Sequence, residues 1–434
     1  MADAIPGSPK PEVFADWMLL FPLGRFHCYD DPDAAAAAVA GDATAVAADT
    51  STGESGYITF TLRHPSEVSY LDLHWPYGTP ESVFDAFPAN ASAVGSHENL
   101  VLLSISLARM EYRIRAPDLF VYTFGPSSPP PSLRRLAACT ETTKDLAGGR
   151  VFLMVESDVG ILCRGGDPNN YVVADLFVSW KQTSFPDERD FTTNPPQMFA
   201  RLCTFSPKKG DWTIKEMLAP QPHGQGQFPY LWYCDRVLPF AGRYLCWVDH
   251  YSGLVYTPVP GNQQFPTKRL IERYSPESFR NVSVSQGMIR FVHIDTDRQG
   301  LQTSDQAVAV WNLMTMGDSW SWEIHRKINL EDLWVKHSYR VLGLPPLVPE
   351  FPFVTKNDPD VLCGVLREDG FSGRVWIIYV DLKQLVVLSC VHYINEQIVC
   401  HRDAIDNEEH RNFLPHEPWL PSYIPRYLNK PQGN

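Results

Sequence analysis

The sequence predicts an all-β fold on three observations. Short runs rich in Val, Ile, Tyr, Trp and Phe recur along the chain and alternate apolar with polar residues, as half-buried strands do. Connections rich in Pro, Gly and Asp separate these runs. Amphipathic helical patterns are few, and residues 331–337 offer no more than one short turn. With 44% hydrophobic residues in 434 positions, the chain has enough apolar side chains for a large core.

Little regular structure is expected before residue 57. Residues 1–12 read as a flexible lead, residues 17–21 are a short buried run, and the Ala-rich stretch 34–48 predicts a loop with at most one short helix. Strand patterns follow, interrupted by a loop-like or weakly helical stretch at 76–99. The expected strands cover residues 57–62, 68–75, 101–107, 111–115, 119–124, 150–156, 160–164, 171–180, 199–205, 212–217, 243–249, 254–259, 288–294, 307–313, 321–325, 361–367, 374–381 and 385–392.

The grouping of these strands predicts a β-propeller-like architecture with few short helices. Groups of hairpins recur about every 45 to 55 residues, which fits the blades of a propeller. We expect about six blades, with the N-terminal strands supplying or completing one of them. Paired β-sandwiches are the competing architecture. On this basis the chain divides into an N-terminal segment, residues 1–95, and a propeller-like body, residues 96–430.

The charge balance argues against an electrostatic partner. The net charge is −13, and basic residues occur in isolated pairs such as Arg134-Arg135 and Lys208-Lys209, not in a stripe. Nucleic-acid binding depends on neutralising phosphates, so neither a nucleic-acid nor a membrane-surface partner is expected. No apolar stretch approaches about 20 residues, so no transmembrane helix is expected.

The nine cysteines are expected to be free thiols. Their number is odd, no C-x-x-C pair occurs, and most lie in apolar runs, as Cys203 and Cys363 do. Buried free thiols are typical of a reducing compartment, and the N-terminus shows no secretory pattern. These features predict a cytoplasmic or nuclear protein.

No residue set predicts catalysis, metal binding or a cofactor. The chain has no G-x-S-x-G elbow, P-loop, G-x-G-x-x-G or H-E-x-x-H motif. Asp295 opens a segment that resembles a calcium loop, but Gln306 stands where the bidentate Glu is needed, so a polar connection is favoured. Asp249 and His250 place an acid and a base in one turn, although Asp before Gly253 is also what a hairpin loop requires.

One ordered set of residues resembles a known family. It runs Cys246-Trp247-Val248-Asp249, then a turn with Tyr251, then Gly253 and an apolar strand, and later a V-x-x-W-x-L run that contains Trp311. This order is similar to the plant family called domain of unknown function 1618, which is expanded in grasses. The family's named domain is expected near residues 246–380, and shorter segments agree with it at 17–20, 64–69, 413–415 and 425–428.

The chain departs from that family in two respects. The strand after Gly253 reads Val255-Tyr256 where the family often has Cys-Asp, and no convincing F-box helices precede the domain. No activity is established for the family, so the resemblance implies a propeller-like fold and protein recognition. The signature residues are expected to be structural, with Trp247 anchoring its blade and Asp249 supporting the turn.

The sequence therefore favours a non-enzymatic scaffold that recognises another protein through its rim loops. One alternative is a propeller hydrolase or lyase that uses carboxylate and His groups near the central axis. It predicts titratable groups with shifted pKa values converging in one deep pocket, with Asp249 and His250 within hydrogen-bond reach of another acid or His. Another alternative is a substrate-recognition module linked to ubiquitin ligation. The partner's identity and the oligomeric state are left open.

Overall fold

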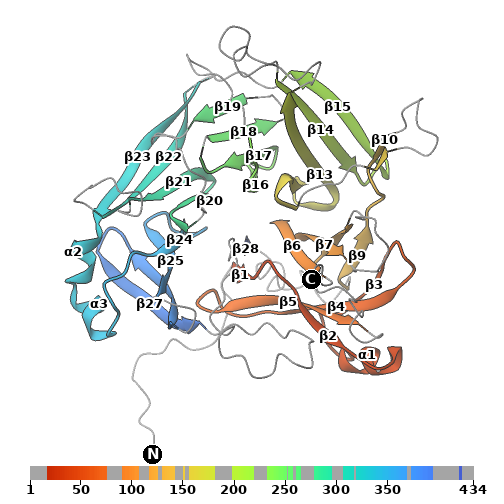
Figure 1. The fold of residues 1–434 in the computed structure, drawn as a ribbon, viewed down its shortest axis with the longest axis horizontal. Coiled ribbons are helices and arrows are strands. Elements are labelled where there is room, and N and C mark those ends of the chain that lie inside the picture. The colour runs from red at the N-terminus through yellow and green to blue at the C-terminus, as the bar shows by residue number, and fades with distance from the viewer. Residues whose placement is uncertain are drawn as a thin grey trace, which may run out of the picture.

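The computed structural model describes residues 17–75, 90–106, 117–125, 130–141, 150–151, 156–180, 198–218, 232–251, 253–257, 261–264, 278–295, 306–316, 319–368, 373–393 and 420–422. Six small sheets stand around a central axis as a six-bladed β-propeller (Figure 1). This arrangement confirms the prediction of an all-β propeller with about six blades, and it excludes the paired β-sandwiches.

Five blades are four-stranded antiparallel sheets in which each strand pairs with the next along the chain. The first strand of each lies nearest the axis, where it contacts the first strand of a neighbouring blade. Blade 1 comprises β6 (Asn90–His97), β7 (Leu100–Ser106), β8 (Asp118–Thr123) and β9 (Ser132–Arg135). Blade 2 comprises β12 (Val159–Arg164), β13 (Asp167–Trp180), β14 (Met198–Ser206) and β15 (Asp211–Leu218). Blade 3 comprises β16 (Arg236–Phe240), β17 (Tyr244–Asp249), β18 (Gly253–Thr257) and β19 (Gly261–Gln264).

The remaining regular blades follow the same plan. Blade 4 comprises β20 (Arg280–Ser285), β21 (Met288–Ile294), β22 (Ala307–Met316) and β23 (Ser319–Asn329). Blade 5 comprises β24 (Glu350–Val354), β25 (Val361–Arg367), β26 (Val375–Asp381) and β27 (Val386–Tyr393). Between blades 1 and 2 lie the short ribbon β10 (Thr140–Glu141) and β11 (Arg150–Val151) and the 3-10 turn η1 (Glu156–Asp158).

Blade 6 combines segments that are far apart in the sequence. It comprises β1 (Met18–Leu20), β2 (Arg25–Cys28), β3 (Val46–Asp49), β4 (Ser55–Thr61), β5 (Val68–Trp75) and β28 (Leu420–Ser422). The strand order is β28-β1-β5-β4-β3, and β2 also pairs with β5. Because β1 pairs antiparallel with β28 and parallel with β5, main-chain hydrogen bonds join the two segments and close the ring.

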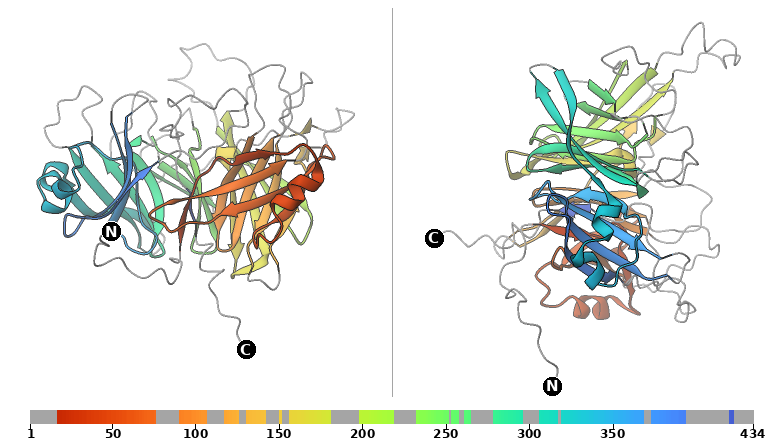
Figure 2. Two further views of the ribbon diagram at one scale, coloured as in Figure 1. Left: turned by 90° about the horizontal axis from the view of Figure 1, so that it is seen from below. Right: turned by 90° about the vertical axis from the view of Figure 1, so that its left-hand side faces the viewer.

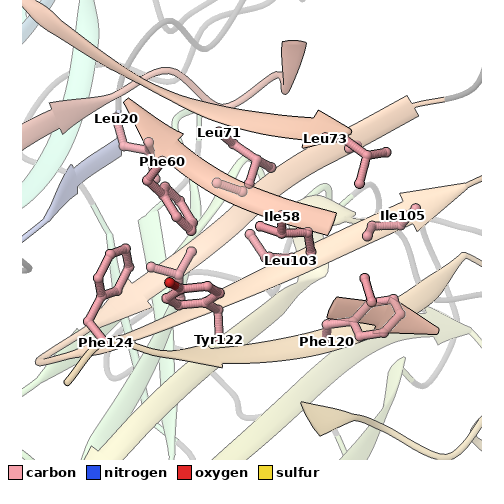
Figure 3. Close-up of a cluster of buried hydrophobic side chains, with 14 of the residues drawn as sticks. Leu20, Ile58, Phe60, Leu71, Leu73, Leu103, Ile105, Phe120, Tyr122 and Phe124 are labelled. Atoms are coloured by element: carbon pink, nitrogen blue, oxygen red, sulfur yellow. The ribbon is translucent and has the colours of Figure 1, made fainter. Parts of the chain in front are cut away.

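Apolar side chains fill the boundary between every pair of neighbouring blades. Six clusters of buried residues lie between successive blades, including one between blade 5 and blade 6. Figure 3 shows the cluster between blades 6 and 1, where the rings of Phe60 and Tyr122 meet edge to face with centroids 4.9 Å apart. Each buried apolar side chain contributes roughly 1.5–3 kcal/mol, so these boundaries hold the blades together.

Helices are few and lie on the outer wall of the ring (Figures 1 and 2). The helix α1 (Pro32–Ala38) forms in the Ala-rich stretch, capped by the Asp31 carboxylate, which accepts the N–H of Ala34 at 2.7 Å. The helices α2 (Leu330–Trp334) and α3 (His337–Val341) connect blades 4 and 5. Among the described residues no helix is long and apolar enough to cross a membrane.

Several expectations of local structure were wrong, and one strand cannot be compared. Regular structure begins before residue 57 with β1, β2, α1 and β3, and two short helices, not one turn, stand at residues 330–341. Residues 76–99 were expected to be loop or weak helix, yet β6 begins at Asn90. The run of Ala, Ser and Gly in β6 has little side-chain bulk, so the sequence shows no strand pattern there. The strand forms through its antiparallel pairing with the apolar strand β7. The strand expected at 111–115 lies outside the described residues. The eight cysteines in the described part of the chain are free thiols, and six are buried.

Candidate functional site

The signature residues of the predicted family lie mainly on the β17–β18 hairpin of blade 3. Cys246, Trp247 and Val248 are fully buried. Gly253 opens β18 with a φ of 153°, a backbone conformation that residues with a side chain rarely adopt. Glycine at this position therefore lets the chain turn directly into the second strand.

Trp247 links blade 3 to blade 2. Its indole packs with Leu162 of blade 2, and its Nε1 donates a hydrogen bond to the backbone oxygen of Asp158 at 2.7 Å. Cys246 and Val248 point to the opposite face of the strand, into the cluster shared with blade 4. Because successive side chains of β17 point to opposite faces of the sheet, this one strand contributes to the clusters on both sides of blade 3.

Asp249 supports the turn that follows β17. Its buried carboxylate accepts the backbone N–H of Tyr251 at 2.8 Å and that of Tyr233 at 3.3 Å. Charge-assisted bonds to two backbone donors fix the turn and satisfy much of the carboxylate's hydrogen-bonding capacity.

His250 lies in the same turn and is also buried. Its backbone N–H donates to Oδ2 of Asp235 at 2.6 Å, and its backbone oxygen accepts from Nη1 of Arg280 at 3.2 Å. Its ring Nδ1 lies 3.7 Å from the same Asp235 oxygen, which is longer than a hydrogen bond. The acid and the base of this turn thus contact mainly backbone groups of the fold.

The sequence-based search missed three residues that complete this cluster. Asp235 lies just before β16, Arg280 is the first residue of β20, and His293 lies on β21. Nε of Arg280 donates to Nδ1 of His293 at 3.2 Å, and burial together with Arg280 lowers the pKa of His293 to about 3. No local pattern marks these residues, because only the packing of blades brings them to the turn.

Two further carboxyls, Asp158 just before β12 and Asp175 on β13, have raised pKa values. Burial raises the pKa of Asp158 to about 6, partly offset by a hydrogen bond from the Ser157 hydroxyl. Burial raises the pKa of Asp175 to about 8, and nearby Cys203 and Asp158 add to the effect. Asp175 is deeply buried, whereas Asp158 is half-buried. Of the two residues, Asp158 is the more exposed.

Trp311 lies apart from the hairpin, on β22 of blade 4. It stacks on Phe291, with ring centroids 5.4 Å apart and an interplanar angle of 27°, beside the cluster between blades 3 and 4. The structure therefore brings Cys246 to Gly253 together on one hairpin but places the two signature tryptophans at different blade boundaries. Within the described ranges no group of three or more His, Cys, Asp or Glu side chains is arranged to hold a metal ion.

This geometry defines the class of the protein as a six-bladed β-propeller with its signature hairpin buried between blades. Residues 241–363 match the family described as "Protein of unknown function (DUF1618)". The match contains the β17–β18 hairpin and Trp311, and it confirms the family resemblance predicted from those residues.

Comparison with other proteins adds two distant structural similarities. A search of curated proteins finds no match. A crystal structure described as a "putative 6-phosphogluconolactonase" from Bacteroides uniformis is 8% identical, with a TM-score of 0.30 over 87% of this chain and 97% of the other. A second one, given the same description and from Bacteroides fragilis, is 9% identical, with a TM-score of 0.28 over 80% of this chain and 94% of the other.

Proposed function

We propose that the protein is a non-enzymatic scaffold that binds a protein partner through the connection between blades 4 and 5, on the outer wall of the ring. The supporting observation is a set of four exposed apolar residues on this connection and on the adjoining strand β27, which we call the patch: Val335, Val341, Leu342 and Leu388. These side chains are 59%, 68%, 48% and 55% exposed, and they make up half of the large hydrophobic residues exposed in the described part of the chain. Scattered exposed apolar residues are ordinary, but a cluster of them is typical of an interaction surface.

The patch rests on a well-packed support. Leu330, Leu333 and Tyr339 of the same two helices are buried in the cluster between blades 4 and 5. The N–H of Val387 on β27 donates to the Ser338 hydroxyl oxygen at 3.2 Å, which ties α3 to the neighbouring strand. Figure 1 shows both helices outside the ring beside blade 5. A rigid apolar surface loses little conformational entropy on binding.

The exposed charges next to Val335 and Val341 indicate the chemistry of the partner. Lys336 and Arg340 are exposed beside these two residues, whereas the exposed acids Glu331 and Asp332 lie in the first turn of α2. A partner segment that offers apolar side chains flanked by carboxylates would match both features. The cytoplasmic or nuclear location and the plant origin expected from the sequence stay predictions.

Proximity labelling tests the proposal in cells that naturally produce the protein. The double variant Val341→Asp, Leu342→Asp places two charges in the patch, so we expect it to lose a defined set of labelled proteins. A labelled candidate should then bind the purified wild-type protein directly, and the charge-reversed variant Lys336→Glu, Arg340→Glu should bind it at least tenfold more weakly, a loss of about 1.4 kcal/mol.

Leu218→Asp is the matched control. Leu218 is 55% exposed on β15, in blade 2 on another part of the ring. All variants should keep the thermal melting curve of the wild type, because the changed side chains face solvent. Identical labelling by the patch variant and the wild type would contradict the proposal, and so would an equal loss in the Leu218→Asp control.

One observation favours hydrolysis or lyase chemistry as a second candidate. Asp158 is half-buried beside the start of an innermost strand, and its pKa of about 6 suits an acid or base that works near neutral pH. The carboxylate of Asp249 and one oxygen of Asp235 accept backbone N–H groups, so they are poor partners for it. Turnover of an ester, lactone or glycoside panel by the wild type, abolished in Asp158→Asn, would place this candidate first.

A further inference from the structure

Two cysteine side chains lie in contact where the chain passes from blade 1 to blade 2. Cys139 lies on the segment after β9, and Cys203 lies in the middle of β14. Both are buried, they form a small cluster of their own, and their thiols share a hydrogen bond. The two residues are far apart in the sequence, so the fold brings together a pair of thiols that no spacing pattern marks.

The segment that carries Cys139 is anchored on both blades. The backbone N–H of Leu136 donates to the Leu119 oxygen of blade 1 at 2.8 Å. The Ala137 oxygen accepts a hydrogen bond from Nε1 of Trp212 on β15 of blade 2 at 2.6 Å, and Trp212 also packs against the thiol pair. These contacts fix the path of the segment and hold the two thiols close together, which disulfide formation requires.

The two thiols differ in how a reagent can reach them. Cys139 is 4% exposed, but the two residues directly before it are exposed. Cys203 is 0% exposed and is flanked across the sheet by Asp175 on β13 and Ile214 on β15. A small opening of the surface segment exposes Cys139, whereas exposing Cys203 requires strands of a blade to separate. Cys139 is therefore the thiol that a dissolved oxidant meets first.

The environment of Cys139 makes its own oxidation slow and the step that follows fast. The hydrogen bond with Cys203 and burial both raise the pKa of the Cys139 thiol, so little of the reactive thiolate is present at neutral pH. Once Cys139 is oxidised, the Cys203 thiol beside it reacts within the molecule, where its effective concentration is far above that of a dissolved thiol. Such a pair stays reduced until an oxidant persists, and then it closes.

We propose that Cys139 and Cys203 form a reversible disulfide when the protein meets hydrogen peroxide, and that this bond ties the surface segment to blade 2. The Cys139 sulfur attacks a peroxide oxygen and breaks the O–O bond. The departing hydroxide takes the thiol proton and leaves as water, so Cys139 becomes a sulfenic acid. The Cys203 sulfur then attacks the Cys139 sulfur, and the displaced hydroxyl leaves as a second water with the Cys203 proton. The two sulfurs together lose two electrons, which the peroxide gains.

Reduction reverses this change by thiol–disulfide exchange. Two dissolved thiols, such as two molecules of glutathione, join in a new disulfide and give their protons to Cys139 and Cys203. The disulfide involves no residue of the outer patch and needs no protein partner. Its test is therefore independent of the proposed function.

Peptide mapping of the purified full-length protein tests the proposal. The reduced protein is treated with graded hydrogen peroxide, the remaining thiols are alkylated, and the digest is analysed by mass spectrometry without reductant. We expect a linked pair of peptides that carries Cys139 and Cys203 and is lighter by two hydrogen atoms than the separate peptides. Dithiothreitol should convert this linked pair back to two thiols.

Single substitutions check the order of the two steps. Cys203→Ala should stop at the sulfenic acid of Cys139, which dimedone traps, and Cys139→Ala should leave Cys203 unmodified. Cys28→Ala, at a half-buried cysteine of blade 6, is the control and should form the linked pair as the wild type does. Thermal melting checks that each variant is folded. A wild type whose other thiols are oxidised while this pair stays unlinked would overturn the proposal, and so would a pair that links only in urea.

Hydrogen exchange measures what the bond does to the fold. Because the disulfide ties the segment to β14, we expect the backbone amides of residues 136–139 to exchange several-fold more slowly in the oxidised protein than in the reduced one. The amides of β22 in blade 4 should exchange equally in both forms. Equal exchange of residues 136–139 in the two forms would show that the disulfide does not tie the segment to blade 2.

Discussion

At the residue scale, burial decides which ionisable groups carry charge. Asp175 is 3% exposed, and its pKa rises to about 8 because desolvation opposes the carboxylate and nearby Cys203 and Asp158 add to that effect. The ordinary aspartate pKa of 3.8 applies to the unfolded chain, so between pH 3.8 and about pH 8 the folded protein holds a proton that the unfolded chain has released. Composition cannot predict such a shift, because the sequence does not show which aspartates become buried.

This difference in proton binding predicts how stability depends on pH. The contribution of Asp175 to the free energy of unfolding is fully present below about pH 4 and is lost as the pH rises through about 8. This loss amounts to no more than about 1.4 kcal/mol per pH unit. Asp175→Asn should therefore flatten the decline in unfolding free energy between pH 5 and pH 8. Urea denaturation at several pH values measures this pH dependence of the unfolding free energy, and Asp30→Asn, at an exposed aspartate, is the control. A decline unchanged by Asp175→Asn would contradict the assignment.

At the scale of single strands, the sequence predicted the second and third strands of the blades better than the first. Strands such as β7, β21 and β26 are rich in Leu, Ile and Val, and alternate residues point into two neighbouring clusters. The innermost strands β16 and β20 read Arg-Val-Leu-Pro-Phe and Arg-Asn-Val-Ser-Val-Ser and were not predicted. β16 is a five-residue run that contains Pro239, and in β20 only two valines alternate with small serines, so neither gives a strong strand pattern.

The candidate site was predictable to a similar extent. Trp247 and Asp249 could be identified because they lie in one short segment that resembles a family. Asp235 and Arg280 could not, since they belong to other strands that reach the turn only after the blades pack.

The structural interpretation of the signature residues predicts different costs for replacing Trp247 on β17 and Trp311 on β22. Trp247→Phe removes buried indole volume and the hydrogen bond to the Asp158 oxygen, so we expect a loss of about 2–3 kcal/mol in unfolding free energy. Trp311→Phe keeps a ring that can stack on Phe291 and should cost less than about 1.5 kcal/mol. Chemical denaturation measures both variants, and equal losses would show that Trp247 does not anchor the blade boundary.

At the scale of the whole molecule, the ring depends on one contact that no repeat pattern could reveal. The spacing of hairpins predicted blades, because every blade repeats a similar length of chain. Closure instead requires Leu19 to lie opposite Pro421, in strands separated by nearly the whole chain. Blade 6 is therefore the blade with the most non-local pairing, and loop closure makes such contacts expensive in entropy.

A designed disulfide at this contact tests ring closure directly. Pro421 has no N–H, so it cannot form the paired hydrogen bonds of a bonded pair, and non-bonded antiparallel pairs bring Cα atoms to about 4.5 Å. Leu19→Cys with Pro421→Cys should therefore cross-link under mild oxidation, which mass spectrometry of proteolytic fragments detects. Closing a loop of roughly 400 residues should stabilise the oxidised form over the reduced form by up to about 6 kcal/mol, before any strain. Each single-cysteine variant should show no such gain, and a double variant that stays reduced would indicate that the ring is open at this blade in solution.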